Sequence, residues 1–202
     1  MLDNKYLYSF NTYLFDLDNT IYDENIYLFE GYKKIALRIE SITSVDHISI
    51  WEDIKLHFFK FGREGLFNSL IAKYNLKESS LDDFLKIQRT LRLGFKMELF
   101  PGIEKLLFRL QECKKNVLIV TNGNPSQQRN KINQINWKGL EPSVIFVLAD
   151  EIVKKPSALL FQCIKKKYKI EESETLMIGD SDVDMKFANN SKIKFLNVSE
   201  MI

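Results

Sequence analysis

The residues best suited to chemistry begin with two aspartates near the start of the chain. Asp16 and Asp18 stand two residues apart, directly after a short apolar run, and Thr20 follows them. A carboxylate can act as a nucleophile, as a proton carrier or as a metal ligand. Three later segments add what this pair lacks: a hydroxyl, a cation and further carboxylates. An enzyme is indicated if these four segments meet in the fold.

The later segments are short polar runs that each come after an apolar stretch. In chain order they are Thr121-Asn122-Gly123, Lys155-Pro156 and Gly179-Asp180-Ser181-Asp182-Val183-Asp184. Each has an ordinary structural reading when it stands alone. The first is then a turn, the second a surface lysine, and the third a helix start, because aspartate is common at helix N-termini.

The apolar pattern predicts the elements that position these runs. Apolar runs predict strands over 13–15, 116–120, 144–148, 176–178 and 193–198. Helical spacing fills the intervals after residue 100, and Asn124-Pro125 reads as a helix start with proline at the first helical position. Strands that alternate with helices predict an α/β fold with a three-layer, Rossmann-like parallel sheet.

A long block between the first strand and this alternation has helical spacing instead. From Ile21 to about Met97 it contains four amphipathic segments, which predict a small helical bundle. Ser80 and Asp83 are predicted to cap the start of the fourth helix.

The predicted strand ends bring the polar residues to one rim of the sheet. In open parallel sheets, ligands bind just beyond the carboxyl ends of the strands. Asp16, Thr121 and Asp180 fall at such ends, and Lys155 precedes the helix after the third strand. We therefore expect these side chains to converge.

Taken in order, the four motifs resemble those of the haloacid dehalogenase superfamily, from about Tyr13 to Val198. The resemblance implies an α/β core over 1–21 and 98–202, with an inserted α-helical cap over 22–97. Haloalkanoate dehalogenases of this superfamily lack an acid at the Asp18 position. The aspartate there indicates the phosphatase branch, and the implied substrate is a small phosphorylated metabolite.

The resemblance also implies a catalytic role for each aspartate of the first motif. Asp16 attacks phosphorus and forms an aspartyl-phosphate, which needs no separate base because a carboxylate is already ionised. Asp18 is the general acid for the leaving oxygen and then the base that activates water. We expect neighbouring carboxylates to raise the pKa of Asp18 for this role.

The second and third motifs are expected to bind the phosphoryl group. The Thr121 hydroxyl and the Asn122 backbone N–H face its oxygens, and Lys155 supplies compensating positive charge. Lys154 is the runner-up for that role, but Lys155 directly precedes the proline, as in the family pattern.

The number of carboxylates predicts a metal ion. Two like charges about 4 Å apart repel by roughly 4 kcal/mol at an effective dielectric constant of about 20. Four carboxylates beside a phosphate therefore call for a cation, and oxygen ligands around phosphate favour Mg²⁺. By resemblance, the ligands are the Asp16 and Asp180 carboxylates and the Asp18 backbone carbonyl. Asp184 has a supporting role, through water or by orienting Lys155.

Three alternatives were compared with this hypothesis. A calcium loop requires glycine at position six and glutamate at position twelve, whereas the two acidic runs supply Ile21 and Tyr27, or Met185 and Ser191. A phosphomutase of the same family stays open. A phospho-accepting regulatory domain resembling response-regulator receivers is disfavoured, because receivers have no large helical insertion.

The composition of the chain bears on its binding partners and on its cellular location. The 202 residues carry a net charge of +2 with no basic face, which disfavours nucleic-acid binding. Cys113 and Cys163 stand in helical apolar patterns and are predicted to be buried free thiols, which suits a reducing compartment. No signal-peptide layout and no apolar run of about 20 residues is present, so we expect a cytoplasmic protein without a membrane partner. The sequence carries no signal for an oligomeric state.

Overall fold

The computed structural model describes residues 7–201, which fall into two compact units. The core unit runs up to Glu24 and resumes at Phe95, and the helical unit comprises Asn25–Gly94.

The core unit is built on a five-stranded parallel sheet with the strand order β3-β2-β1-β4-β5. The strands are β1 (Thr12–Phe15), β2 (Asn116–Thr121), β3 (Val144–Leu148), β4 (Thr175–Gly179) and β5 (Lys194–Asn197). Every residue of β1 is buried, as expected of a central strand covered on both faces. The predicted parallel α/β sheet is confirmed.

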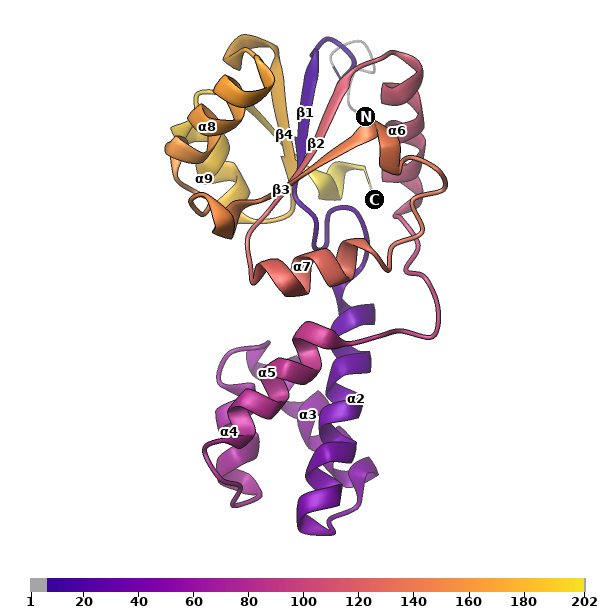
Figure 1. Cartoon of the computed structure of the whole chain (residues 1–202), viewed down its shortest axis with the longest axis vertical. Helices are drawn as coiled ribbons and strands as arrows, with labels where there is room; N and C mark the ends of the chain where they lie inside the picture. The colour runs from indigo at the N-terminus through magenta and orange to yellow at the C-terminus, as the bar shows by residue number, and fades with distance from the viewer. Residues whose placement is uncertain (1–6, 202) are drawn as a thin grey trace. The chain divides into compact units, whose positions relative to one another are not determined.

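Helices cover both faces of this sheet. They are α6 (Pro101–Glu112), α7 (Pro125–Ile132), α8 (Ala158–Tyr168) and α9 (Asp182–Asn190). Figure 1 shows α8 and α9 on one face of the sheet and α6 on the other, which confirms the three layers. Four short 3₁₀ turns complete the unit: Glu141–Ser143, Ala149–Glu151, Glu172–Glu174 and Val198–Glu200.

The strand register determines which face carries the functional residues. Leu14 pairs with Leu118 on one side and Met177 on the other, and all three pack in the cluster that includes α8 and α9. Because side chains alternate along a strand with a period of two, Asp16 follows Leu14 on the same face. The first aspartate is thus directed toward the layer from which α9 begins.

The helical unit has its own apolar core. Its helices are α2 (Glu24–Thr43), α3 (His47–Phe61), α4 (Leu66–Lys73) and α5 (Ser80–Thr90). Buried side chains from all four form one cluster, comprising Leu28, Tyr32, Ile35, Ala36, Ile39, Ile50, Ile54, Leu66, Leu70 and Phe84. The four predicted amphipathic segments are therefore helices that pack together.

Two local predictions are wrong. Helix α5 begins at Ser80 with Ser79 as its N-cap, and no side chain caps it, so the predicted Ser80 and Asp83 pair does not form. Cys113 and Cys163 are free thiols as predicted, but both are exposed. Cys163 falls outside the buried stripe of α8, and Cys113 lies at the open C-terminal end of α6.

None of the helices in the described part of the chain combines the length and apolar character needed to cross a membrane.

Two adjacent leucines on α8 provide a matched test of this packing. Leu160 is fully buried in the core cluster, whereas Leu159 is 59% exposed. We expect Leu160→Ala to lower the free energy of unfolding by about 2–5 kcal/mol, because it removes buried methyl groups and leaves a cavity. Leu159→Ala should change it by less than about 0.5 kcal/mol. Urea unfolding followed by circular dichroism measures both, and equal losses would contradict the placement of α8.

Candidate active site

The site is built around Asp16, which comes directly after the central strand. Its backbone N–H donates to the Ile178 carbonyl at 2.9 Å, which extends the pairing of β1 with β4 by one residue. The side chain is 9% exposed, so an ionised carboxylate at this position needs a positive partner.

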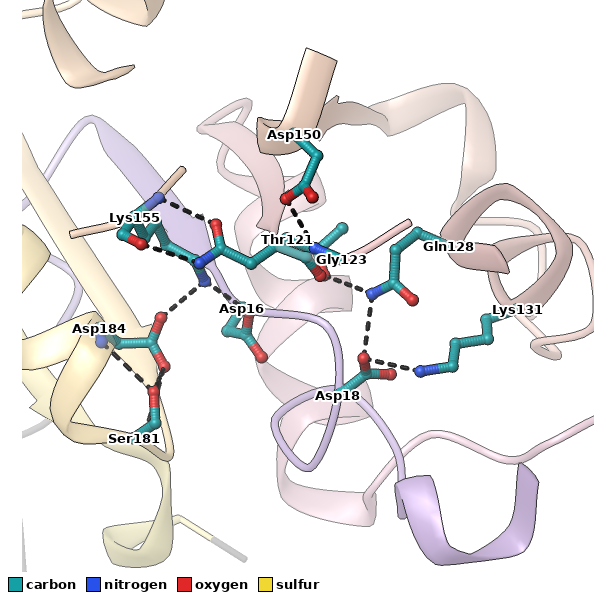
Figure 2. Close-up of polar contacts among 11 residues, drawn as sticks. Asp16, Asp18, Thr121, Gly123, Gln128, Lys131, Asp150, Lys155, Ser181 and Asp184 are labelled. Carbon is teal, nitrogen blue, oxygen red and sulfur yellow. Dashed lines mark hydrogen bonds and ion pairs between the residues drawn. The ribbon is translucent and has the colours of Figure 1, made fainter. Parts of the chain in front are cut away.

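Lys155 supplies that partner and joins two motifs. Its Nζ lies 2.5 Å from Asp16 Oδ1 and 2.6 Å from Asp184 Oδ1, and the lysine side chain is 2% exposed (Figure 2). Burial acts to lower the pKa of Lys155, but the two carboxylates outweigh it and raise that pKa above its usual value. Lys155 therefore stays charged. The sequence-level runner-up, Lys154, has a 68% exposed side chain and pairs with Asp150 instead.

Asp184 is oriented by the first turn of α9. The Ser181 N–H donates to Asp184 Oδ2 at 3.3 Å and the Asp184 N–H donates to Ser181 Oγ at 3.3 Å, which forms a capping box. The Ser181 hydroxyl also donates to Asp184 Oδ2, at 2.6 Å. Asp184 Oδ2 thus accepts hydrogen bonds from Ser181 at the start of α9, and Oδ1 accepts one from Lys155. Gly179 makes this approach possible, because a Cβ there would lie 2.6 Å from the Asp184 side chain.

The turn after β2 is attached to the Lys155 loop by one side chain. Asn122 Nδ2 donates to the Lys155 carbonyl at 2.9 Å, and the Lys155 N–H donates to Asn122 Oδ1 at 2.9 Å. On the other side, the Gly123 N–H donates to Asp150 Oδ1 at 2.8 Å. Thr121, at the end of β2, is 2% exposed. These bonds hold the second motif close to the third.

Asp18 lies in a different polar environment from Asp16. Its Oδ1 accepts from the Tyr22 hydroxyl at 2.7 Å, and its Oδ2 accepts from Gln128 Nε2 at 2.9 Å and from Lys131 Nζ at 2.8 Å. Figure 2 shows the two α7 side chains directed at this carboxylate.

These contacts correct the expected pKa of Asp18. Burial acts to raise that pKa, but the Lys131 charge and the hydrogen bonds from Lys131, Gln128 and Tyr22 outweigh burial and hold it below its usual value. The prediction that neighbouring carboxylates raise it is wrong, because the buried Lys131 ammonium group contacts Asp18 directly. Asp18 is therefore a carboxylate near neutral pH.

Three carboxylates form the group best suited to a metal ion. Oxygens of Asp16, Asp180 and Asp184 all lie within 4.8 Å of one another. Burial raises the pKa of Asp16 to about 7 despite the opposing Lys155, with Asp184 and Asp18 adding to the shift. Burial and Asp184 also raise the pKa of Asp180. Negative charge is therefore under-compensated here, and an oxygen-only donor set of this kind fits a hard divalent cation.

The polar residues of α7 were not among the site residues predicted from the sequence. Gln128 and Lys131 are 2% exposed, yet each reads as a surface residue in the polar sequence of this helix. Their separation of three residues, on the helix that follows Thr121, puts both on one helix face. That spacing, directly after the Thr121-Asn122-Gly123 motif, could have indicated that both side chains lie at the site.

Alanine at position 179 tests the close approach of β4 and α9. We expect Gly179→Ala to destabilise the protein by about 1–3 kcal/mol, because the added methyl group displaces Asp184 and its bond to Lys155. Gly94→Ala is the matched control, since no heavy atom lies within 4 Å of the added methyl group. Thermal unfolding measures both, and a Gly179→Ala protein as stable as the control would contradict this geometry.

Comparison with known proteins gives partial matches to two archaeal proteins named glyceraldehyde 3-phosphate phosphatase. Over 81 residues the chain is 37% identical to glyceraldehyde 3-phosphate phosphatase from Pyrococcus abyssi. The matched segment is 40% of this chain, and it spans only 33% of the archaeal protein.

Solved structures share the fold across most of the chain. A protein from Thermotoga maritima provisionally assigned as a β-phosphoglucomutase has a TM-score of 0.66 at 15% identity, with 92% of this chain and 83% of that chain covered. A provisionally assigned hydrolase from Bacillus subtilis, bound to magnesium, has a TM-score of 0.61 at 24% identity, with coverages of 92% and 87%. The family model described as haloacid dehalogenase-like hydrolase matches residues 13–198. The chain belongs to the haloacid dehalogenase-like hydrolase family.

Proposed function

We propose that this protein is a Mg²⁺-dependent phosphatase that hydrolyses the phosphomonoester of a small metabolite through an aspartyl-phosphate on Asp16. The observation that carries the proposal is the contact of Lys155 with both Asp16 and Asp184 at the carboxyl end of the sheet, with Asp18 and Thr121 on the same rim. The partial identity to an archaeal phosphatase supports the same reaction class.

Asp16 has one oxygen held and one available for attack. Oδ1 accepts the bond from Lys155, and no hydrogen bond to Oδ2 comes from residues 7–201. In the first step, Asp16 Oδ2 forms a bond to phosphorus while the bond from phosphorus to the ester oxygen breaks. Lys155 compensates for the charge that gathers on the phosphoryl oxygens, together with the Thr121 hydroxyl and the Asn122 N–H.

Asp18 carries the proton in both steps. As an acid it protonates the departing ester oxygen. As a base it takes a proton from water, whose oxygen bonds to phosphorus while the bond from phosphorus to Asp16 Oδ2 breaks and inorganic phosphate is released. The lowered pKa of Asp18 favours the ionised form, which is the one that the second step requires. A dianionic phosphate beside Asp18 favours the protonated form by Coulombic repulsion, which serves the first step.

The residues proposed to hold Mg²⁺ are Asp16 and Asp180, through their carboxylates, and Asp18, through its backbone carbonyl. The close carboxylate oxygens of Asp16, Asp180 and Asp184 fit such a site, and Asp184 supports it by orienting Lys155. When bound, the ion would offset the repulsion between these carboxylates and the phosphate. We assign substrate selection to the helical unit, in keeping with the inserted cap that the family resemblance implies.

Substitution of the nucleophile tests the reaction. We expect Asp16→Asn to lower hydrolysis of 4-nitrophenyl phosphate to background while the protein stays folded, because the amide cannot form the aspartyl-phosphate. The control is Asp82→Asn on the exposed side of α5, which should retain full turnover. Release of 4-nitrophenol measures activity, and circular dichroism measures folding. Turnover by Asp16→Asn in a clean preparation would refute the nucleophile.

Metal removal tests the acidic cluster. We expect protein treated with EDTA to lose turnover and to recover it with Mg²⁺. Asp180→Asn should raise the Mg²⁺ concentration for half-maximal activity by at least about tenfold, the lower end of the effect seen when a metal site is disturbed. Asp46→Asn is the control, because it lies in a separate cluster with Glu40 and His47 in the helical unit. Full turnover in EDTA would contradict the proposed metal.

A panel of phosphorylated metabolites identifies the substrate and separates two reactions. Release of inorganic phosphate indicates a phosphatase, whereas an isomerised product without release indicates a phosphomutase.

A further inference from the structure

Helix α7 carries a buried lysine that none of the four motifs contains. Lys131 Nζ lies 2.8 Å from Asp18 Oδ2 and 2.7 Å from Glu24 Oε1, and its side chain is 2% exposed. Glu24 is also buried, with a side chain that is 9% exposed. One ammonium group therefore bridges the candidate acid–base residue and a second carboxylate that has no role in the proposed reaction.

Gln128, one turn earlier on α7, reinforces the same contact. Its Nε2 donates to Asp18 Oδ2 at 2.9 Å and to the Thr121 hydroxyl at 2.6 Å. Since Tyr22 donates to Asp18 Oδ1, both oxygens of the carboxylate are held. The carboxylate therefore has a restricted orientation relative to the end of β2.

The position of α7 is itself well determined. Asn124 caps its first turn by accepting from the Gln127 N–H at 3.2 Å, and Pro125 occupies the first helical position. The preceding Gly123 is bonded to Asp150. A helix fixed at its start can place Gln128 and Lys131 reproducibly over Asp18.

The positive charge of Lys131 and its position between two carboxylates affect the orientation of Asp18. Removing one partner of a buried ion pair typically costs several kcal/mol, because the other charge is left uncompensated. Here the loss of Lys131 would leave Asp18 and Glu24 as two facing carboxylates, which repel. Proton transfer needs a donor–acceptor distance of about 2.6–3.2 Å, so a carboxylate that turns away loses its function even in a folded protein.

We propose that Lys131 and Gln128 are positioning residues that hold the Asp18 carboxylate in the orientation from which it exchanges a proton with the leaving oxygen. The inference rests on the proposed phosphatase function. It adds that one face of α7 determines how efficiently Asp18 transfers a proton to the leaving oxygen. Two rival roles for Lys131 are a purely structural ion pair and a direct contact with the phosphate.

The three roles differ in how activity depends on the leaving group. An alkyl phosphate releases a strongly basic oxygen that must be protonated, whereas 4-nitrophenyl phosphate releases a stable phenolate. The value of kcat/KM reports only steps up to departure of the leaving group. A displaced Asp18 therefore lowers kcat/KM for alkyl phosphates far more than for 4-nitrophenyl phosphate. Loss of a phosphate contact lowers both equally and weakens inhibition by inorganic phosphate.

The experiment compares the wild type with Lys131→Met, Lys131→Arg and Gln128→Met on both substrate types. For Lys131→Met we expect kcat/KM to fall about 100-fold with an alkyl phosphate, in line with the contribution of general acid catalysis. With 4-nitrophenyl phosphate it should fall less than about tenfold. Gln128→Met should show the same pattern more weakly, and Lys131→Arg should restore part of the loss. Inhibition by inorganic phosphate should stay within about twofold of the wild type.

The matched control is Lys165→Met. Lys165 lies on α8 and pairs with Glu171 and Glu172, which follow that helix. This variant should have the kcat/KM values of the wild type on both substrates. Equal losses on both substrates, or no loss, in folded Lys131→Met would overturn the inference and leave the phosphatase proposal intact. If that variant does not fold, the same comparison in Gln128→Met and Lys131→Arg decides. Absence of hydrolysis by the wild type would instead overturn the proposed function, and this inference with it.

Discussion

The architecture of the site depends on one buried cation between two carboxylates. Lys155 contacts Asp16 after β1 and Asp184 on α9, so it links three segments that are far apart in the sequence. Burying either carboxylate without this lysine would be costly, and burying the lysine without them would be equally so. The remaining contacts at the rim serve this arrangement. Ser181 orients Asp184, Gly179 gives it room, and the parallel register of β1 with β4 brings the two acids to the same level.

A second buried lysine also lies between two carboxylates, but the net pKa shift of its aspartate is different. This lysine is Lys131, and one of its two partners is Asp18 rather than Asp16. The two aspartates of the first motif, only two residues apart, therefore have separate ammonium partners on separate segments. Their pKa values move in opposite directions. At Asp16, burial outweighs Lys155 and raises the pKa, whereas at Asp18 the Lys131 charge and the hydrogen bonds outweigh burial and lower it. A nucleophilic carboxylate must be ionised, so the charge of a divalent cation beside Asp16 would favour its reactive form.

Much of this fold was predictable because its signals are local. The apolar runs that form β1 to β5 and the polar residues that end them follow one another along the chain, and parallel strands then bring those ends together. The parts that were not predictable depend on contacts between distant segments. Lys131 has the sequence environment of a surface lysine, and only the packing of α7 over residues 18–24 buries it. The pKa of Asp18 was mispredicted for the same reason. The predicted cap at Ser80 is absent because α5 starts one residue earlier than that cap requires. Cys163 is exposed because the buried face of α8 is formed by Leu160, Phe161 and Ile164.

The contact of Asn122 with Lys155 has a consequence for how such a protein can change over evolutionary time. The amide of Asn122 pairs with both the N–H and the carbonyl of residue 155, in the manner of a neighbouring strand. The main chain of residue 155 is therefore anchored to the rim separately from its side chain. A lineage that exchanged this lysine would keep the backbone anchor, but it would also have to change Asp16 or Asp184, which the lysine charge compensates. Asn122 thereby fixes the location of a functional group, while the charges around it must change together.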